Sequence, residues 1–159
     1  MNEPVLLGGC LCGSVRYRVN GALGLAEHCH CSMCRKAHGA AFSSNAVVPS
    51  SKFEVTDGDE LITQYESSPG RRKYFCSKCG SQLFIRRLSK PELMVITLGT
   101  LDAAPNAKPE RHVFVASKAP WVSIVDGLPQ FLIYPGFEPE GGTHVAEPAF
   151  RSSSLPSVA

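Results

Sequence analysis

The chain has 159 residues, of which 43% are hydrophobic, and its formal net charge at neutral pH is +2. This length suits a single domain with a substantial core. No apolar run is long enough to span a bilayer, and the few basic residues form no concentrated stripe of the kind that binds nucleic acid. We therefore expect a soluble one-domain protein with neither membrane nor nucleic-acid partners.

Short strands separated by turns dominate the predicted elements. The first strand, near residues 14–19, alternates polar and apolar side chains with the period of a half-buried strand, and Asn20-Gly21 after it is a turn signal. Further strand-like runs occupy residues 42–48, 61–65, 73–75, 83–86, 93–98 and 112–115. The sequence thus predicts a mainly β fold.

Two short helices are also expected. Ser32 can cap a helix over residues 33–38 that ends at Gly39, and Pro120 can open a second one that runs to Val125. The sequence shows neither a βαβ rhythm nor a phosphate-binding glycine loop. Residues 1–137 are predicted to form the domain. Residues 138–159, rich in Gly, Ser and Pro, are predicted to form a polar C-terminal tail.

The seven cysteines are the most informative residues, because they fall into three tight clusters. Their number is odd, the spacing within each cluster is too short for easy bridging, and the first residues show no export signal. A disulfide framework is therefore disfavoured, and the thiols are better suited to holding metal ions. Metal-binding thiols of this kind favour a reducing, cytoplasmic location.

One set of four cysteines has the spacing of a closed zinc site. A Cys-x-Cys pair followed downstream by Cys-x-x-Cys supplies four thiolates, and tetrahedral sulfur ligation favours Zn²⁺. Glycines flank these pairs, as expected where the backbone turns sharply around a metal. The role predicted for this zinc is structural, with a contribution to folding on the order of 10 kcal/mol. The four ligands are Cys10, Cys12, Cys76 and Cys79.

The remaining cysteines, Cys29, Cys31 and Cys34, are one ligand short of a closed tetrahedron. Three protein ligands and an exchangeable fourth position are typical of catalytic zinc, and the open position can receive a thiol from outside the chain. Two alternatives remain at this point. A nearby histidine, His28, His30 or His38, completes a closed structural site, or the triplet binds zinc weakly and loses it.

Other residues carry weaker signals. The basic runs at 71–73 and 86–87 are interpreted as solvated strand ends, with an anion-binding pocket near the third cysteine cluster as the alternative. Such a pocket would suit a substrate with carboxylates. Arg35, directly after the triplet, is interpreted as an exposed helix arginine rather than a substrate contact.

Three further side chains are candidates for the walls of a pocket rather than for catalysis. Trp121, the only tryptophan, is predicted to lie in the core or in a pocket wall. Phe42 and Asn45, just after the predicted triplet helix, are candidates for lining a pocket at the triplet. No residue is identified as a catalytic acid or base.

The cysteine clusters and their neighbours resemble the glutathione-dependent formaldehyde-activating enzymes, which are grouped with centromere protein V. The resemblance runs from Gly8 to Phe131. It implies a β-tent fold of the Mss-like type, built from antiparallel sheets. Four segments carry it: Gly-Gly-Cys10-Leu-Cys12-Gly-Ser-Val-Arg-Tyr, Cys29-His-Cys31-Ser-Met-Cys34-Arg-Lys, Phe75-Cys76-Ser-Lys-Cys79-Gly-Ser-Gln-Leu-Phe and Ala119-Pro-Trp121.

The resemblance also implies a function. In the founding enzyme of this family a zinc ion at the middle triplet accompanies the structural zinc, and glutathione condenses with formaldehyde to S-(hydroxymethyl)glutathione, a carbon–sulfur lyase chemistry. Two alternatives remain: a related thiol adduct or aldehyde as substrate, and a non-catalytic zinc domain that serves in binding. The sequence leaves monomer and homodimer equally open.

Overall fold

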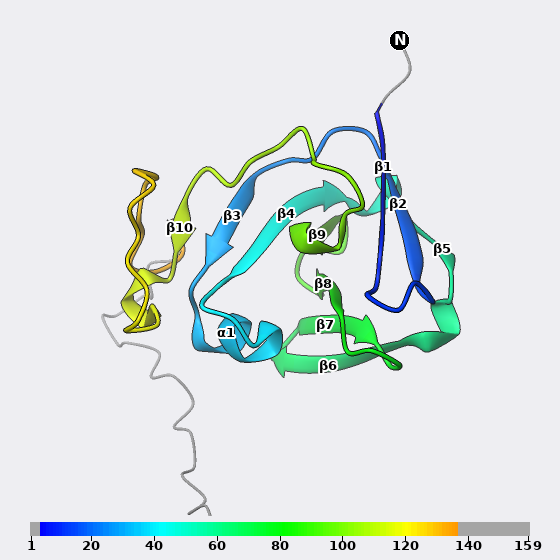
Figure 1. Cartoon of the computed structure of the whole chain (residues 1–159), viewed down its shortest axis with the longest axis horizontal. Coiled ribbons are helices and arrows are strands. Elements are labelled where there is room, and N and C mark those ends of the chain that lie inside the picture. Colours follow the sequence, from blue (N-terminus) through cyan, green and yellow to red (C-terminus); the bar gives the residue numbers. More distant parts are fainter. Residues whose placement is uncertain (1–3, 137–159) are drawn as a thin grey trace, which may run out of the picture.

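The computed structural model describes residues 4–136 and confirms the predicted mainly β class (Figure 1). The predicted tail at 138–159 lies outside the described residues. Short 3-10 turns occupy Ser50–Lys52, Asp59–Leu61, Leu98–Thr100 and Val115–Ser117. The strands and the single described α-helix are β1 (Val5–Gly9), β2 (Arg16–Asn20), β3 (Ala26–Cys29), α1 (Ser32–His38), β4 (Ser43–Pro49), β5 (Phe53–Asp57), β6 (Ile62–Ser68), β7 (Arg71–Cys76), β8 (Gln82–Arg87), β9 (Leu93–Thr97) and β10 (His112–Val113).

The strands form two sheets. A three-stranded sheet has the order β1-β2-β5, and a seven-stranded sheet has the order β10-β3-β4-β9-β8-β7-β6. All of these pairings are antiparallel except β10 with β3, which makes the larger sheet mixed. In Figure 1 the smaller sheet stands at one side of the molecule, and β10 with the segment that follows it stands at the other.

The main core lies between the two sheets. Ala26, Ala46 and Ile96 are aligned across β3, β4 and β9, and all three are buried. They belong to the same core cluster as Tyr17 and Val19 of β2. Because side chains alternate along a strand, the intervening residues of β3, β4 and β9 point to the opposite face of the larger sheet. That opposite face carries the cavities described below.

The buried side chain of Tyr17 forms a hydrogen bond at the edge of the core. Its hydroxyl forms a 2.7 Å hydrogen bond with Oγ1 of Thr100, and burial raises the pKa of the phenol to about 12. The ring lies directly over Gly8, where an added Cβ would come within 2.4 Å of Cζ of Tyr17. Glycine is therefore required at this position of β1.

All seven predicted strands are confirmed, whereas three further strands escaped prediction. The N-terminal strand β1 ends in Gly-Gly, and β3 contains Glu27 and His28, so neither shows a clear β pattern. The edge strand β5 is short and half-exposed. Tertiary pairing, rather than local propensity, determines these three elements.

The two helix predictions had different outcomes. Helix α1 is confirmed at Ser32–His38 with Gly39 as its C-cap, but the N-cap is Cys31 rather than Ser32. The helix predicted from Pro120 to Val125 is wrong. One turn closed by a 3.1 Å bond from Val122 N–H to the Ala119 carbonyl is followed by irregular chain. Trp121 and Val125 are 74% and 88% exposed, so this segment has no apolar face to bury as a helix.

Candidate metal centres and the adjoining groove

The four predicted structural ligands, Cys10, Cys12, Cys76 and Cys79, converge in space. Their Sγ atoms all lie within 4.8 Å of one another, with 3.4 Å between Cys10 and Cys12 and 3.9 Å between Cys12 and Cys76. One pair lies in the connection between β1 and β2. In the other pair, Cys76 ends β7 and Cys79 lies in the turn to β8. The cluster therefore joins the smaller sheet to the larger one.

The local backbone explains how both pairs point inward. Gly13 and Gly80 have φ angles of 75° and 74°, which only glycine adopts without strain. Their N–H groups donate to the carbonyls of Cys10 and Cys76 at 3.0 and 2.8 Å, which closes a tight turn around each pair. The two turns are alike.

Hydrogen bonds to sulfur favour thiolate character at this cluster. The N–H of Val15 donates to Sγ of Cys10 at 3.2 Å. Hydrogen bonding by the side chain of Ser81 lowers the pKa of Cys79 to about 5, whereas burial raises the pKa of Cys76 to about 11. Four converging sulfurs with backbone donors fit a tetrahedral Zn²⁺ ion, since the ligands bind as thiolates.

The three remaining cysteines also come together. Cys29 ends β3, Cys31 caps α1, and Cys34 lies in the first turn of that helix. All three are buried, and their sulfurs lie within 4.8 Å of one another. The N–H of Cys34 donates to Sγ of Cys31 at 3.3 Å, which is both the helix cap and a sulfur contact. The soft donor set fits Zn²⁺ with one ligand position left over.

Charge within this triplet concentrates on Cys34. Side-chain hydrogen bonds from Cys29 and Cys31 lower the pKa of the Cys34 thiol, and the Lys73 ammonium contributes in the same direction. Lys73 is almost fully buried, with Nζ 3.5 Å from Sγ of Cys34. The thiol of Cys29 is the counterpart: hydrogen bonding with Cys31 and Cys34 raises its pKa.

The structure does not bring a histidine to the triplet. Within residues 4–136 no histidine nitrogen belongs to the three-sulfur cluster. His28 contacts Oγ of Ser44 at 2.9 Å through Nδ1, and His30 contacts Nδ1 of His112 at 2.8 Å through Nε2. Strand alternation explains this for two of the candidates, because His28 and His30 flank Cys29 and point to the other face of β3. His38, one turn after Cys34 on α1, also contributes no nitrogen to the cluster. The geometry therefore favours an open three-cysteine site over a closed one.

A cavity opens beside the triplet, and Cys29 and Cys34 line it. Asn45 lies in its wall. The amide nitrogen of Asn45 donates to Oγ of Ser43 at 2.8 Å, while its buried Oδ1 has no hydrogen-bond partner in the structure. A buried polar atom without a partner is costly, which makes Oδ1 a candidate contact for a bound molecule. Arg71 adds positive charge to the same wall.

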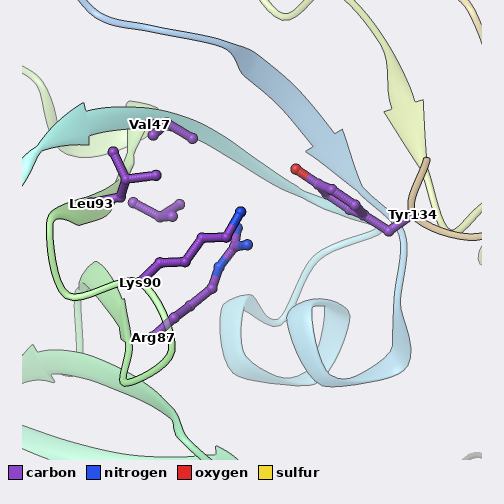
Figure 2. A pocket seen from close by; sticks show the side chains of 6 residues that line it. Val47, Arg87, Lys90, Leu93 and Tyr134 are labelled. Atoms are coloured by element: carbon purple, nitrogen blue, oxygen red, sulfur yellow. The ribbon is translucent and has the colours of Figure 1, made fainter. Parts of the chain in front are cut away.

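A second cavity adjoins the first and shares Arg87, Val95 and Tyr134 with it. Figure 2 shows the ends of the Arg87 and Lys90 side chains and the hydroxyl of Tyr134 directed toward one space. Tyr134 is held in place by Arg111, whose Nη2 lies 3.2 Å from the hydroxyl and whose Cζ lies 5.2 Å from the ring centre. We call the two adjoining cavities the basic groove.

The basic runs divide between the two interpretations, and the arginines that line a cavity do so beside Cys29 and Cys34 rather than at the third cysteine cluster. Arg71 and Arg87 line the basic groove, whereas Arg72 forms a 3.5 Å ion pair with Glu66. Arg86 is exposed, and its Cζ lies 5.9 Å from the Tyr74 ring centre. Strand alternation on β8 separates Arg86 from Arg87.

Several pocket predictions need correction. Phe42 packs against the rings of His28, His30 and His112 and is not among the residues that line the basic groove. Trp121 is exposed, and so is neither core nor pocket wall. Arg35 is half-buried rather than exposed.

Sequence reasoning missed Lys90 and Tyr134, both of which line the basic groove. Lys90 lies in the turn between β8 and β9, and Tyr134 comes from the irregular segment after β10. Neither position has a motif around it, and only the folded chain brings them to the triplet.

None of the helices in residues 4–136 is long and apolar enough to cross a membrane.

Comparison with known proteins places these clusters in context. A family model described as "Glutathione-dependent formaldehyde-activating enzyme" matches residues 5–117. Two relatives each named "Putative glutathione-dependent formaldehyde-activating enzyme" are similar to the chain. The one from Halomonas elongata is 33% identical over 76% of this chain and 81% of its own. The one from Talaromyces marneffei is 30% identical over 87% of this chain and 71% of its own.

A solved structure is also similar. A crystal structure of a Rhodobacter sphaeroides protein aligns with a TM-score of 0.53 and 28% sequence identity, and the match covers 63% of this chain and 91% of that one. The match of the family model spans most of the domain and includes all seven cysteines. The chain belongs to the family of glutathione-dependent formaldehyde-activating enzymes.

Proposed function

We propose that this protein condenses glutathione with formaldehyde to S-(hydroxymethyl)glutathione, with the reaction at Cys29, Cys31 and Cys34. The observation that carries the proposal is the basic groove, which opens onto two of the three buried thiols of an incomplete metal site. The family resemblance and the names of the two relatives support the same reaction.

Two zinc sites belong to the proposal. Cys10, Cys12, Cys76 and Cys79 hold a structural ion, and the triplet holds a second, more labile one. Zinc at the triplet supplies Lewis acidity that keeps an incoming thiol deprotonated near neutral pH. The Lys73 ammonium, 3.5 Å from Sγ of Cys34, offsets the negative charge of the crowded sulfurs. These reduced thiols suit a cytoplasmic enzyme.

The basic groove matches glutathione in charge. Glutathione carries two carboxylates, and Arg71, Arg87 and Lys90 supply cations along the groove. Arginine pairs with carboxylates through two parallel hydrogen bonds, so it fixes orientation as well as charge. With a carboxylate held near Lys90, the peptide extends toward the triplet. Oδ1 of Asn45 is then positioned to accept a hydrogen bond from a substrate N–H or O–H.

The proposed reaction requires no strong acid or base from the protein. The glutathione sulfur adds to the carbonyl carbon of formaldehyde, a C–S bond forms, and the π electron pair of the carbonyl moves to oxygen, which takes a proton from solvent. Formaldehyde is reactive enough that positioning the two reactants and favouring the thiolate account for the acceleration. No side chain is assigned as a strong general acid.

The experiment compares wild type with Cys34→Ser by following S-(hydroxymethyl)glutathione formation with NMR, and by melting both proteins with and without glutathione. Wild type should accelerate the condensation and be stabilised by glutathione, by about 2.7 kcal/mol at a hundredfold excess over Kd. Cys34→Ser should lose the acceleration. A wild type with no acceleration and no stabilisation would instead identify a zinc domain that serves in binding. Stabilisation without acceleration would point to another aldehyde or thiol adduct as substrate.

A further inference from the structure

Three side chains outside the cysteine clusters form a second kind of metal-ligand group. His28 of β3, His112 of β10 and Asp126 of the following segment each place one donor atom within 4.8 Å of the other two. The parallel pairing of β10 with β3 puts His112 directly beside His28, with ring centres 4.9 Å apart. Because Cys29 is the next residue along β3, its sulfur points to the opposite face from these rings.

We infer that His28, His112 and Asp126 form a binding site for a divalent transition-metal ion, separate from both cysteine clusters. Two imidazoles and one carboxylate are the donors of many zinc and non-haem iron sites, which keep open positions for water or substrate. Asp126 is exposed, so the open positions face solvent. The chemical class of the ligand is therefore a borderline-soft divalent cation such as Zn²⁺.

Hydrogen bonds hold Nδ1 of each ring, and a cation would replace the hydrogen bond between His112 and Asp126. Nδ1 of His28 lies 2.9 Å from Oγ of Ser44, which leaves Nε2 as the atom available to a metal. Nδ1 of His112 lies 2.8 Å from Nε2 of the buried His30, and Nε2 of His112 lies 2.9 Å from Oδ2 of Asp126. Partners of this kind on the far ring nitrogen fix the orientation of metal-ligating histidines.

A hydrogen bond also fixes the orientation of the Asp126 carboxylate. Its other oxygen, Oδ1, accepts the N–H of Leu128 at 3.0 Å, which sets the carboxylate against His112. Strand pairing places His28 beside His112 and opposite Ser44, so the fold itself brings the three donors together. The three donors are therefore preorganised around one point at which a cation would bind.

The test titrates Zn²⁺ by calorimetry into the full chain with its cysteine-bound zinc in place. Wild type should bind one further ion. Asp126→Asn should bind it about 100-fold more weakly, while its amide oxygen keeps the bond to Leu128 and so the local structure. Asp57→Asn, at the exposed end of β5, is the matched control and should bind like wild type.

Two further measurements separate this site from the others. Ser44→Ala, which removes the partner of His28, should weaken the additional binding about tenfold. Histidine-ring NMR should show zinc perturbing Nε2 of His28 and of His112. Cys31→Ser should retain the additional binding, so failure of the proposed condensation leaves this result intact. If wild type binds no further zinc, or if Asp126→Asn binds it as tightly as wild type, the site is overturned.

Discussion

The two cysteine clusters both present thiol sulfurs, but they differ in the number of sulfurs and in the structure around them. Cys10, Cys12, Cys76 and Cys79 lie in two matching glycine turns and form a complete ligand set that joins the sheets. The triplet lies at a strand end and a helix start, is buried, and borders a cavity. A complete set of sulfurs stabilises the fold, whereas an incomplete set beside a basic groove can exchange its fourth ligand.

The largest effect should follow from breaking the four-cysteine cluster. In Cys76→Ser we expect loss of one zinc ion and unfolding of the chain, because structural zinc contributes on the order of 10 kcal/mol. Zinc content and thermal unfolding measure this. Cys31→Ser is the control and should melt within a few degrees of wild type. A Cys76→Ser protein that melts normally would contradict the structural role.

Removing the buried cation should affect the triplet alone. Lys73→Met keeps the length of the side chain but deletes the ammonium beside Cys34, so the triplet should bind zinc roughly 10- to 100-fold more weakly. Competition with a chelator measures the affinity. Lys78→Met is the control, since Lys78 is exposed and contacts Ser14 near the other cluster. Equal zinc affinities in both variants would show that Lys73 does not stabilise zinc at the triplet.

The basic groove can be tested by two neighbouring arginines of β8. Arg87→Ala should raise KM for glutathione roughly tenfold with little change in kcat, because a charge-assisted hydrogen bond is lost. Arg86→Ala, whose side chain is exposed and lies near Tyr74 instead, should keep the wild-type KM. Initial rates over a range of glutathione concentrations give both constants. Similar KM values for both variants would mean that glutathione does not lie along Arg87.

The smallest effect concerns the core beside the four-cysteine cluster. Tyr17→Phe loses the bond to Thr100 and should cost about 1 kcal/mol of unfolding free energy, with zinc content unchanged. The fold raises the pKa of Tyr17 to about 12, so it favours the neutral phenol. This contribution is complete below about pH 10 and is lost as pH rises through 12. Denaturant unfolding should show that alkaline loss in wild type and not in the variant.

The sequence was sufficient for the parts of the molecule that depend on local pattern. Cysteine spacing predicted both clusters, and the cap at Gly39 predicted the end of α1. The sequence was not sufficient where contacts between distant parts of the chain determine the position of a side chain. Phe42 was expected at the triplet, yet it packs on the histidine rings of the other face, and Tyr134 reaches the groove from a segment without any motif. Phe42 precedes β4 and Tyr134 lies in irregular chain, so tertiary packing rather than a local pattern decides where each side chain lies.

The most direct test of the comparison is the amount of zinc released per chain when an organomercurial blocks the thiols, measured together with the condensation rate. The account predicts about two cysteine-bound zinc ions in wild type, and one in Cys31→Ser with the acceleration lost and the fold kept. One released zinc ion in wild type, together with a melting temperature that glutathione leaves unchanged, would contradict it.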